Sequence, residues 1–343
     1  MGKIDMSKYK IRTDLAIESI KNYENEIKAQ ENIIDDIKIT KIEVKKEYEE
    51  KINKKTGKYI TIEFDDVTDY NNRQKLIDVF SKELNSLLND IKVNEKSSAL
   101  IIGLGNEKST PDALGPNTID NILVTRHLFS LEGSNIEDGF RCVAAFNPGV
   151  MGVTGIETSD VIKSLVKYTK PDFLIVVDAL AASAISRINR TIQMTDSGIH
   201  PGSGVGNSRK EISKDTLNIP VIAIGIPTVV DAVTIVSDTI NYMEQHFSYV
   251  TENINNPANK LSISTANYTK RKNIKDLNKE DKRKYMGFLG ELEEEEIKEL
   301  IFEVLSPINY NLMVTPKEVD FLIDKLSEVL STGINKSLHK SFK

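Results

Sequence analysis

The 343-residue chain has no tryptophan, a single cysteine and only four histidines. One cysteine, Cys142, excludes an intrachain disulfide and is typical of a protein from a reducing compartment. No apolar run reaches the roughly 18 to 20 residues that a transmembrane helix needs. The N-terminus also lacks the apolar segment of a secretory signal. These absences predict a cytoplasmic protein that does not bind a membrane.

The chain also lacks an excess of positive charge. Its 45 Lys and Arg residues are interspersed with 51 Asp and Glu residues, and the net charge is −6. Nucleic-acid binding needs a concentrated positive surface, so we predict no direct contact with nucleic acid. Apolar residues make up 39% of the chain, which is enough to bury a large core.

Three common catalytic motifs are missing. Gly103-Leu-Gly105 resembles the start of a dinucleotide-binding loop, but Lys108 stands where the third glycine would fall. No two histidines are four residues apart, and no serine lies in a G-x-S-x-G sequence. His200 is the one histidine in a glycine-rich loop beside acidic residues, which makes it the only one of the four histidines that is a candidate metal ligand. We therefore predict neither a cofactor nor a resident metal.

Continuous apolar runs alternate with helical patterns between residues 98 and 247. The runs are Ala99–Ile102, Phe173–Val177 and Pro220–Gly225, and each is typical of a strand buried on both faces. This alternation predicts an α/β fold, a three-layer sandwich around a mostly parallel sheet. Period-two patterns between residues 37 and 64 predict added N-terminal strands, and the tail predicts added C-terminal helices.

The segment that begins at Asp14 has a different pattern. Apolar residues recur at Leu15, Ile20, Ile27 and Ile34 among charged residues. This spacing predicts a charged amphipathic helix.

Two carboxylates follow two of the apolar runs. Asp178 comes directly after Phe173–Val177, and Asp112 lies in the loop after Ala99–Ile102. Open parallel sheets bind ligands at the carboxyl ends of their strands, so these residues are candidate catalytic groups, although each could also be an ordinary loop cap. If they converge, one carboxyl is held protonated as a general acid while the other activates water. Such a pair suits hydrolysis of peptide bonds.

Several long strings in the sequence are distinctive. They are Thr110-Pro-Asp-Ala-Leu-Gly-Pro116, Val124-Thr-Arg-His127, Pro148-Gly-Val-Met-Gly152, Thr154-Gly-Ile-Glu-Thr-Ser-Asp160, Gly198-Ile-His-Pro-Gly-Ser-Gly-Val-Gly-Asn207, Ile226-Pro-Thr-Val-Val-Asp-Ala232 and Asn311-Leu-Met-Val-Thr-Pro-Lys-Glu-Val-Asp320. These strings strongly resemble those of the spore germination proteases, and the resemblance runs from the leader to the C-terminal helix.

The resemblance implies an endopeptidase that degrades the small acid-soluble proteins that coat spore DNA. It implies a homotetramer in the cytoplasm of the spore core, made as a zymogen that removes its own leader. The implied catalytic pair is Asp112 and Asp178. The implied fold is similar to that of the hydrogenase maturation proteases, a phosphorylase/hydrolase-like fold.

Family substrates are cut after an acidic residue in a Thr-Glu-(Phe/Ile)-Ala context, and Arg12-Thr-Asp-Leu-Ala16 is similar. The resemblance therefore predicts self-cleavage between Asp14 and Leu15. Residues 1–14 would be the propeptide. Residues 15–343 would form a single peptidase domain, with its core at about 98–247, a surface excursion at about 250–290 and C-terminal helices at about 291–343.

An acidic residue before the cut needs a polar or cationic partner. The sequence offers four such substrate-binding candidates and does not choose among them. They are Arg126, Arg187, Arg209 and His200.

The chain departs from the family pattern at two places. Glu107-Lys-Ser109 replaces a Trp-Asn-Val triplet, and Ser183 stands where the family usually has an arginine. Two alternatives stay open. One, suggested by the relatives of the implied fold, is a metal-dependent peptidase that uses Asp112, His200 or Glu157. The other, suggested by Ser183, is a catalytically weakened paralogue that binds spore proteins without cutting them.

Overall fold

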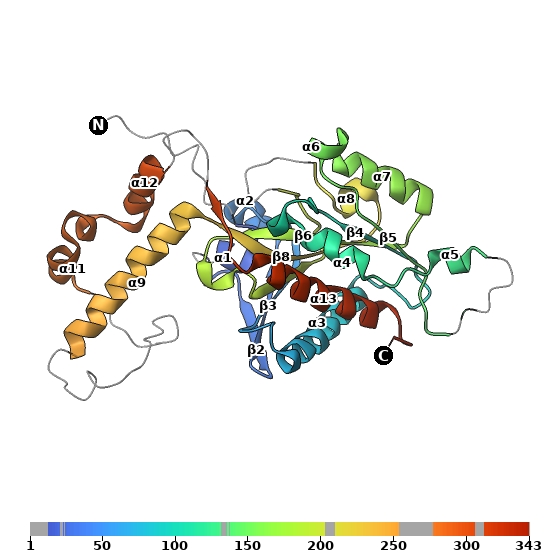
Figure 1. The fold of residues 1–343 in the computed structure, drawn as a ribbon, viewed down its shortest axis with the longest axis horizontal. Coiled ribbons are helices and arrows are strands. Elements are labelled where there is room, and N and C mark those ends of the chain that lie inside the picture. The colour runs from blue at the N-terminus through green and yellow to red at the C-terminus, as the bar shows by residue number, and fades with distance from the viewer. Residues whose placement is uncertain are drawn as a thin grey trace. The chain divides into compact units, whose positions relative to one another are not determined.

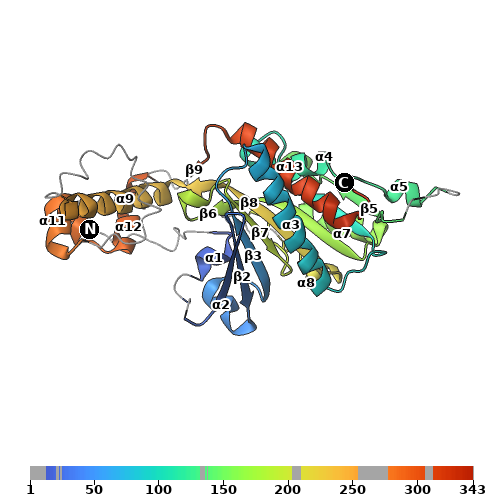
Figure 2. The same ribbon diagram turned by 90° about the horizontal axis from the view of Figure 1, so that it is seen from below.

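The computed structural model is drawn in two orientations in Figures 1 and 2. The structure describes residues 13–20, 23, 25–131, 136, 138–202, 210–253, 277–305 and 312–342. Most of the predicted leader, Arg209 and most of the predicted surface excursion lie outside these residues.

The chain divides into two compact units. Unit 2 takes in residues 12–229 and 315–343, and unit 1 takes in residues 230–314 among those described. The predicted single peptidase domain spans both units and stays a prediction. The strands are β1 (Ala29–Ile34), β2 (Ile37–Val44), β3 (Gly57–Glu63), β4 (Ala99–Gly103), β5 (Val143–Phe146), β6 (Phe173–Ala182), β7 (Thr191–Thr195), β8 (Val221–Asp231) and β9 (Met313–Val314).

Helices make up most of the remaining described structure. Those of unit 2 are α1 (Ala16–Ser19), η3 (Lys46–Tyr48), α2 (Glu49–Ile52), α3 (Tyr70–Asp90), η4 (Thr110–Asp112), α4 (Leu114–Asp120), α5 (Arg126–Phe129), α6 (Met151–Thr154), α7 (Thr158–Thr169), η5 (Ile185–Arg187), α8 (Lys214–Leu217) and α13 (Val319–Leu338). Those of unit 1 are α9 (Ala232–Asn253), α11 (Lys279–Met286), η8 (Gly287–Glu291) and α12 (Glu294–Leu305).

The strands form one mixed sheet in the order β1-β2-β3-β7-β8-β6-β4-β5, with β9 beside β8. β4 pairs in parallel with both β5 and β6. The pairs β1–β2, β2–β3, β3–β7, β7–β8 and β8–β9 are antiparallel. The α/β class is therefore confirmed, but the prediction of a mostly parallel sheet is wrong. The reason is that the added N-terminal strands join the central sheet through β7 instead of forming a separate layer.

A β-hairpin replaces the end of the helix predicted from Asp14 onward. Among the residues described between Asp14 and Ile34, Ala16–Ser19 form the α-helix and Ala29–Ile34 form β1, which pairs with β2 in the register Ile34↔Ile37. Asp35 and Asp36 form the connecting turn with φ values of 49° and 67°. Positive φ at both central residues matches the right-handed twist of a two-residue hairpin, and aspartate tolerates this conformation better than most residues.

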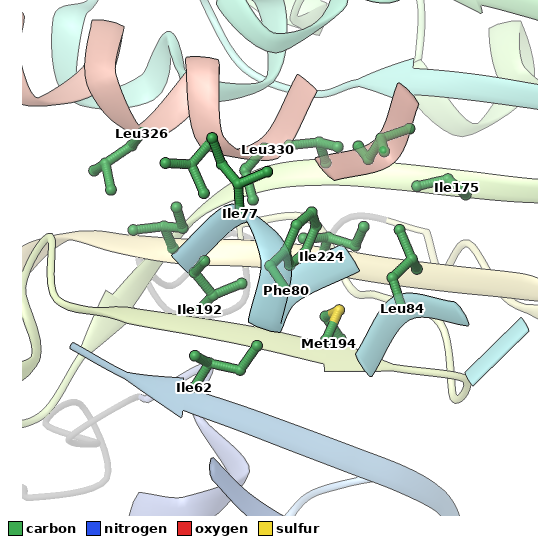
Figure 3. Packing of buried hydrophobic residues seen from close by; sticks show 14 of the residues in the cluster. Ile62, Ile77, Phe80, Leu84, Ile175, Ile192, Met194, Ile224, Leu326 and Leu330 are labelled. Carbon is green, nitrogen blue, oxygen red and sulfur yellow. The ribbon is translucent and has the colours of Figure 1, made fainter. Parts of the chain in front are cut away.

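The helices α3 and α13 lie side by side on one face of the sheet (Figure 2). Asp69 caps α3, because its side chain accepts a hydrogen bond from the backbone N–H of Asn72 at 2.9 Å. The apolar stripe of α3 then packs on β7 and β8, as Figure 3 shows for Phe80 beside Met194 and Ile224. All three side chains are at most 1% exposed, so this layer supplies a large part of the apolar burial that stabilises unit 2.

The opposite face of the parallel strands packs against α7 and the segment around α8 (Figure 1). Leu100 and Ile102 of β4 and Leu174 and Val176 of β6 form one apolar cluster with Ile162 of α7 there. Helices on both faces explain why β4 and β6 are apolar without alternation. The closer likeness to the hydrogenase maturation proteases stays a prediction.

In unit 1, α9 packs against α12 through an apolar cluster centred on Val233, Ile297 and Ile301. The end of β8 pairs with β9 in the register Val230↔Val314. Across the described ranges of both units, no helix combines the length and the apolar composition that crossing a bilayer requires.

Candidate active site

The strands β4 and β6 run side by side but end at different points. Their last paired residues are Gly103 and Val177, and the N–H of Leu104 donates to Val177 O at 2.8 Å. β6 continues past this point through Ala182, farther than the sequence predicted. One edge of β6 is therefore no longer paired with β4 where Asp178 begins.

The loop after β4 presents Asp112. The backbone N–H of Asn106 donates both to Asp112 O at 3.1 Å and to Asp112 Oδ2 at 2.9 Å. These two bonds close the loop, and Gly105 makes the close approach possible. Its φ is 120°, and a Cβ there would lie 2.0 Å from Asp112 O. Thr228 of β8 fixes the loop from the other side, because its hydroxyl donates to Pro111 O at 2.6 Å.

A second glycine brings α4 against the ends of both strands. A Cβ on Gly115 would lie 2.1 Å from Leu104 O and 2.7 Å from Val177 O. Only a residue without a side chain allows this approach. The helix therefore follows Asp112 at once and holds η4 against β6.

Asp178 is 6% exposed, and its Oδ1 accepts a hydrogen bond from the N–H of Ala179 at 2.9 Å. Backbone groups alternate along a strand, so the N–H of Ala179 points to the same edge as Val177 O, the edge that β4 has left. The carboxylate of Asp178 and the η4 helix that ends at Asp112 therefore both lie at the carboxyl end of β4.

The predicted cleavage site occupies the next part of this edge. The N–H of Asp14 donates to Ala181 O at 3.0 Å, and Asp14 Oδ2 accepts from the N–H of Ala181 at 2.9 Å. Ala181 is four residues after Val177, so by the same alternation it faces the same edge. The structure thus brings Asp14 next to the strand that carries Asp178.

Leu15 fixes the depth of this segment. It is 0% exposed and packs against Leu180 and Ala182, which alternate with Ala181 on one face of β6. Asp178 shares that face by the same alternation. Burying a leucine side chain contributes about 1.5–3 kcal/mol, so the apolar residue after Asp14 holds the segment on β6.

Comparisons with known proteins agree with the family resemblance. A family model described as germination protease matches residues 5–343. The chain belongs to the germination protease family. It is 48% identical over 361 residues to the germination protease of Geobacillus sp. (strain WCH70), and this alignment covers 98% of the present chain and 96% of the relative. It is 47% identical over 354 residues to the germination protease of Bacillus subtilis (strain 168), and that alignment covers 99% of the present chain and 96% of the relative. The protein is therefore a peptidase, as predicted, and its family is that of a spore germination endopeptidase.

The cation beside the predicted cleavage site is a residue that the sequence did not single out. Lys54 Nζ donates to Thr13 O at 2.8 Å. Burial lowers the pKa of Lys54, while the charges of Asp14 and Glu18 oppose this shift. The sequence of residues 54–57 indicated only a turn, because nothing local reveals that Lys54 meets a segment forty residues earlier.

Arg187 contacts two carboxylates, those of Glu18 and Glu63. Its Nε lies 3.4 Å from Glu18 Oε1, and its Nη1 lies 2.8 Å from Glu63 Oε1. Glu18 is buried, and it also accepts hydrogen bonds from Thr13 Oγ1 and, at 2.8 Å, from the N–H of Ser183. Ser183, which stands where the family usually has an arginine, thus binds Glu18 through its backbone N–H.

Two of the other candidates have described positions. Arg126 follows Thr125, whose N–H donates to Val143 O at 3.0 Å, beside the amino end of β4. His200 Nε2 lies 3.8 Å from Glu211 Oε2. Arg209 lies outside the described residues. In the part of the chain that the structure describes, no group of three or more His, Cys, Asp or Glu side chains is arranged to hold a metal ion.

Proposed function

We propose that the protein is made as a zymogen that cuts its own chain between Asp14 and Leu15. The observation that supports this most directly is the hydrogen bonding of Asp14 to Ala181, three residues after Asp178 on the same strand. An extended segment that adds to an open strand edge is a common way for proteases and other proteins to bind a chain. Residues 1–14 are then the propeptide.

Asp112 and Asp178 supply the chemistry in this proposal. One carboxyl stays protonated because two close carboxylates do not ionise together. The ionised carboxylate takes a proton from water, whose oxygen adds to the Asp14 carbonyl carbon. The C–N bond to Leu15 then breaks, and the protonated carboxyl gives its proton to the leaving nitrogen. Acid–base assistance of this kind contributes about 10²–10⁴-fold to the rate.

The substrates of the mature enzyme are, in this proposal, the small acid-soluble proteins that protect spore DNA. The motif Thr13-Asp14-Leu15-Ala16 supports this, because it reproduces within the chain the acidic and branched residues at which such proteins are cut. The enzyme works as a homotetramer in the cytoplasm of the spore core. It needs neither a cofactor nor direct contact with DNA or membrane.

Purified full-length chain tests the proposal. Mass analysis after activation should show a new N-terminus at Leu15, and the product should degrade a small acid-soluble spore protein. Asp112→Asn and Asp178→Asn should each lower both rates by about 10²–10⁴-fold. Asp160→Asn is the matched control, because Asp160 lies on the surface of α7 and pairs with Lys210 at 3.1 Å. A different new N-terminus contradicts the cleavage site, and normal cleavage by either active-site variant contradicts the pair.

Two alternatives give different results in the same assays. A metal-dependent peptidase that uses Asp112, His200 or Glu157 would lose activity on exhaustive chelation, whereas the carboxylate pair would not. A weakened spore-protein binder, suggested by Ser183, would retain spore protein on a column without cutting it. Cleavage by the wild-type chain dismisses this second alternative.

A further inference from the structure

Gln193 lies in the middle of β7, where its neighbours in the sheet are Thr61 of β3 and Gly225 of β8. It is 6% exposed. Its side chain leaves the sheet on the face opposite to Ile192 and Met194, which belong to the core under α3. A strand paired on both sides is rigid, so the Gln193 amide has a well-defined position.

Both ends of this amide contact the segment that contains the predicted cut. Gln193 Nε2 donates to Asp14 O at 3.0 Å, and Gln193 Oε1 accepts from the N–H of Ala16 at 2.6 Å. Together the two contacts fix the orientation of the Gln193 side-chain amide. A backbone N–H can only donate, so the amide oxygen must face Ala16 and the amide NH₂ must face Asp14. Gln193 thus holds the main chain on both sides of Leu15.

Asp14 O is the carbonyl oxygen of the bond that the proposed function has the enzyme cut. This oxygen gains negative charge when water adds to the carbonyl carbon. A donor fixed in advance at this position stabilises the charge as it develops. The buried site also strengthens the interaction, because little water competes for the oxygen.

We propose that Gln193 is a catalytic residue of this peptidase, the hydrogen-bond donor to the carbonyl oxygen of the bond that is cut. The inference rests on the proposed function. The side-chain oxygen of Gln193 accepts a hydrogen bond from the N–H of Ala16, the second residue after the cut, and so holds the bond to be cut in position. Both contacts are to main-chain atoms, so Gln193 places no demand on side chains and serves the leader and protein substrates alike.

The first test replaces the amide and follows self-processing of the full chain. Gln193→Met has a similar length and no strong hydrogen-bonding groups, and Gln193→Glu keeps the acceptor but loses the donor. Both should slow the appearance of the Leu15 N-terminus by about 10²–10³-fold, the usual cost of removing an oxyanion donor. Gln30→Met and Gln30→Glu are matched controls on the exposed strand β1 and should process normally. Thermal unfolding of each variant separates a loss of catalysis from a loss of structure.

A second test measures the contact itself and remains informative even where a Gln193 variant is poorly stable. Ala16→Pro removes the N–H that donates a hydrogen bond to Gln193 Oε1. Ala16 is the first residue of α1 after Leu15, whose φ and ψ are −82° and 123°. Proline is well tolerated at this helix position and after an extended residue. Alone it should slow processing by about 5–10-fold, the effect of one neutral hydrogen bond. In the Gln193→Met background it should have no further effect.

The outcomes separate this inference from the proposed function. If the wild-type chain makes no cut between Asp14 and Leu15, the proposed function fails first. If the wild-type chain cuts there and the folded Gln193 variants do so at the same rate, the role of Gln193 is wrong. Ala16→Pro processing at the wild-type rate also overturns it, whatever the stability of the Gln193 variants. Slower cleavage by Gln193→Glu and Gln193→Met, without a change in their melting temperatures, supports the role of Gln193.

Discussion

β4 and β6 begin alike and end differently. Both are apolar, both are covered by helices on each face, and they pair in register from Ala99↔Phe173 to Gly103↔Val177. β4 then turns away at a glycine to present Asp112 on a short loop. β6 continues as a strand, presents Asp178 from within it, and offers Ala181 to Asp14. A small difference in strand length thus creates an open edge of β6, at which the segment containing Asp14 binds three residues after Asp178.

The largest effect should come from disturbing the β4 side. Gly105→Ala would place a Cβ 2.0 Å from Asp112 O at a φ of 120°, where side chains are strained. The loop must shift, and a misplacement of about 1 Å costs roughly 10²-fold in rate. We expect processing to fall at least that far, with unfolding in denaturant showing a loss of about 1–3 kcal/mol.

Gly152→Ala is the control for that change, because a Cβ on Gly152 of α6 would meet nothing within 4 Å. Normal processing by Gly105→Ala would mean that the loop after β4 does not need its observed conformation. Only the open edge of β6 would then be needed for cleavage.

A smaller effect should come from the β6 side. Ala181→Pro removes the N–H that donates to Asp14 Oδ2 at 2.9 Å. This N–H faces the open edge, where proline is tolerated in a sheet. Removing a hydrogen bond to a charged group should slow cleavage between Asp14 and Leu15 by about 10–100-fold. Ala181→Gly keeps the N–H and should process nearly normally, and equal rates for the two variants would show that this contact does not guide the cut.

The smallest effect should be a pH dependence of the stability, which comes from the buried His339. His339 Nδ1 accepts from the N–H of Arg141 at 3.2 Å, and its Nε2 contacts Leu123 O at 3.2 Å. Burial lowers the pKa of His339 below its ordinary 6.5, and the charge of Arg141 lowers it further. Below pH 6.5 the unfolded chain therefore binds more protons than the folded one, and stability falls as the pH drops through the folded value.

Thermal unfolding between pH 8 and 5 tests this. His339→Gln should melt with a flatter dependence on pH, with a difference of at most roughly 4 °C. His127→Gln on α5 is the control for the loss of a histidine side chain. A wild-type slope in His339→Gln would assign the acid sensitivity to other groups.

Local patterns predicted the parts of the fold that are decided locally. The apolar runs located β4 and β6, and the spacing of Leu76, Phe80 and Leu84 located α3. The pairing of β3 with β7 joins residues more than a hundred positions apart, so no local pattern could reveal that the sheet is mixed. The turn at Asp35 and Asp36 was readable in principle, because two aspartates between apolar residues favour a tight hairpin.

The candidate site divides in the same way. Asp112 and Asp178 follow apolar runs and could be predicted from that position. Lys54 and Gln193 contact residues 13–16 only because β3 and β7 come together in the folded sheet. Neither residue has a distinctive neighbourhood in the sequence. The family resemblance predicted the cleavage site, but not the strand that receives it.

The contacts of Asp14 with Ala181 and of Asp14 and Ala16 with Gln193 all lie within one polypeptide. A tethered segment has an effective concentration in the millimolar range, whatever the concentration of the protein. A cut at this place would follow first-order kinetics, with a half-time that dilution does not change. The leader would then act as a timer set by the chain itself, whereas destruction of other proteins would depend on how many molecules are present.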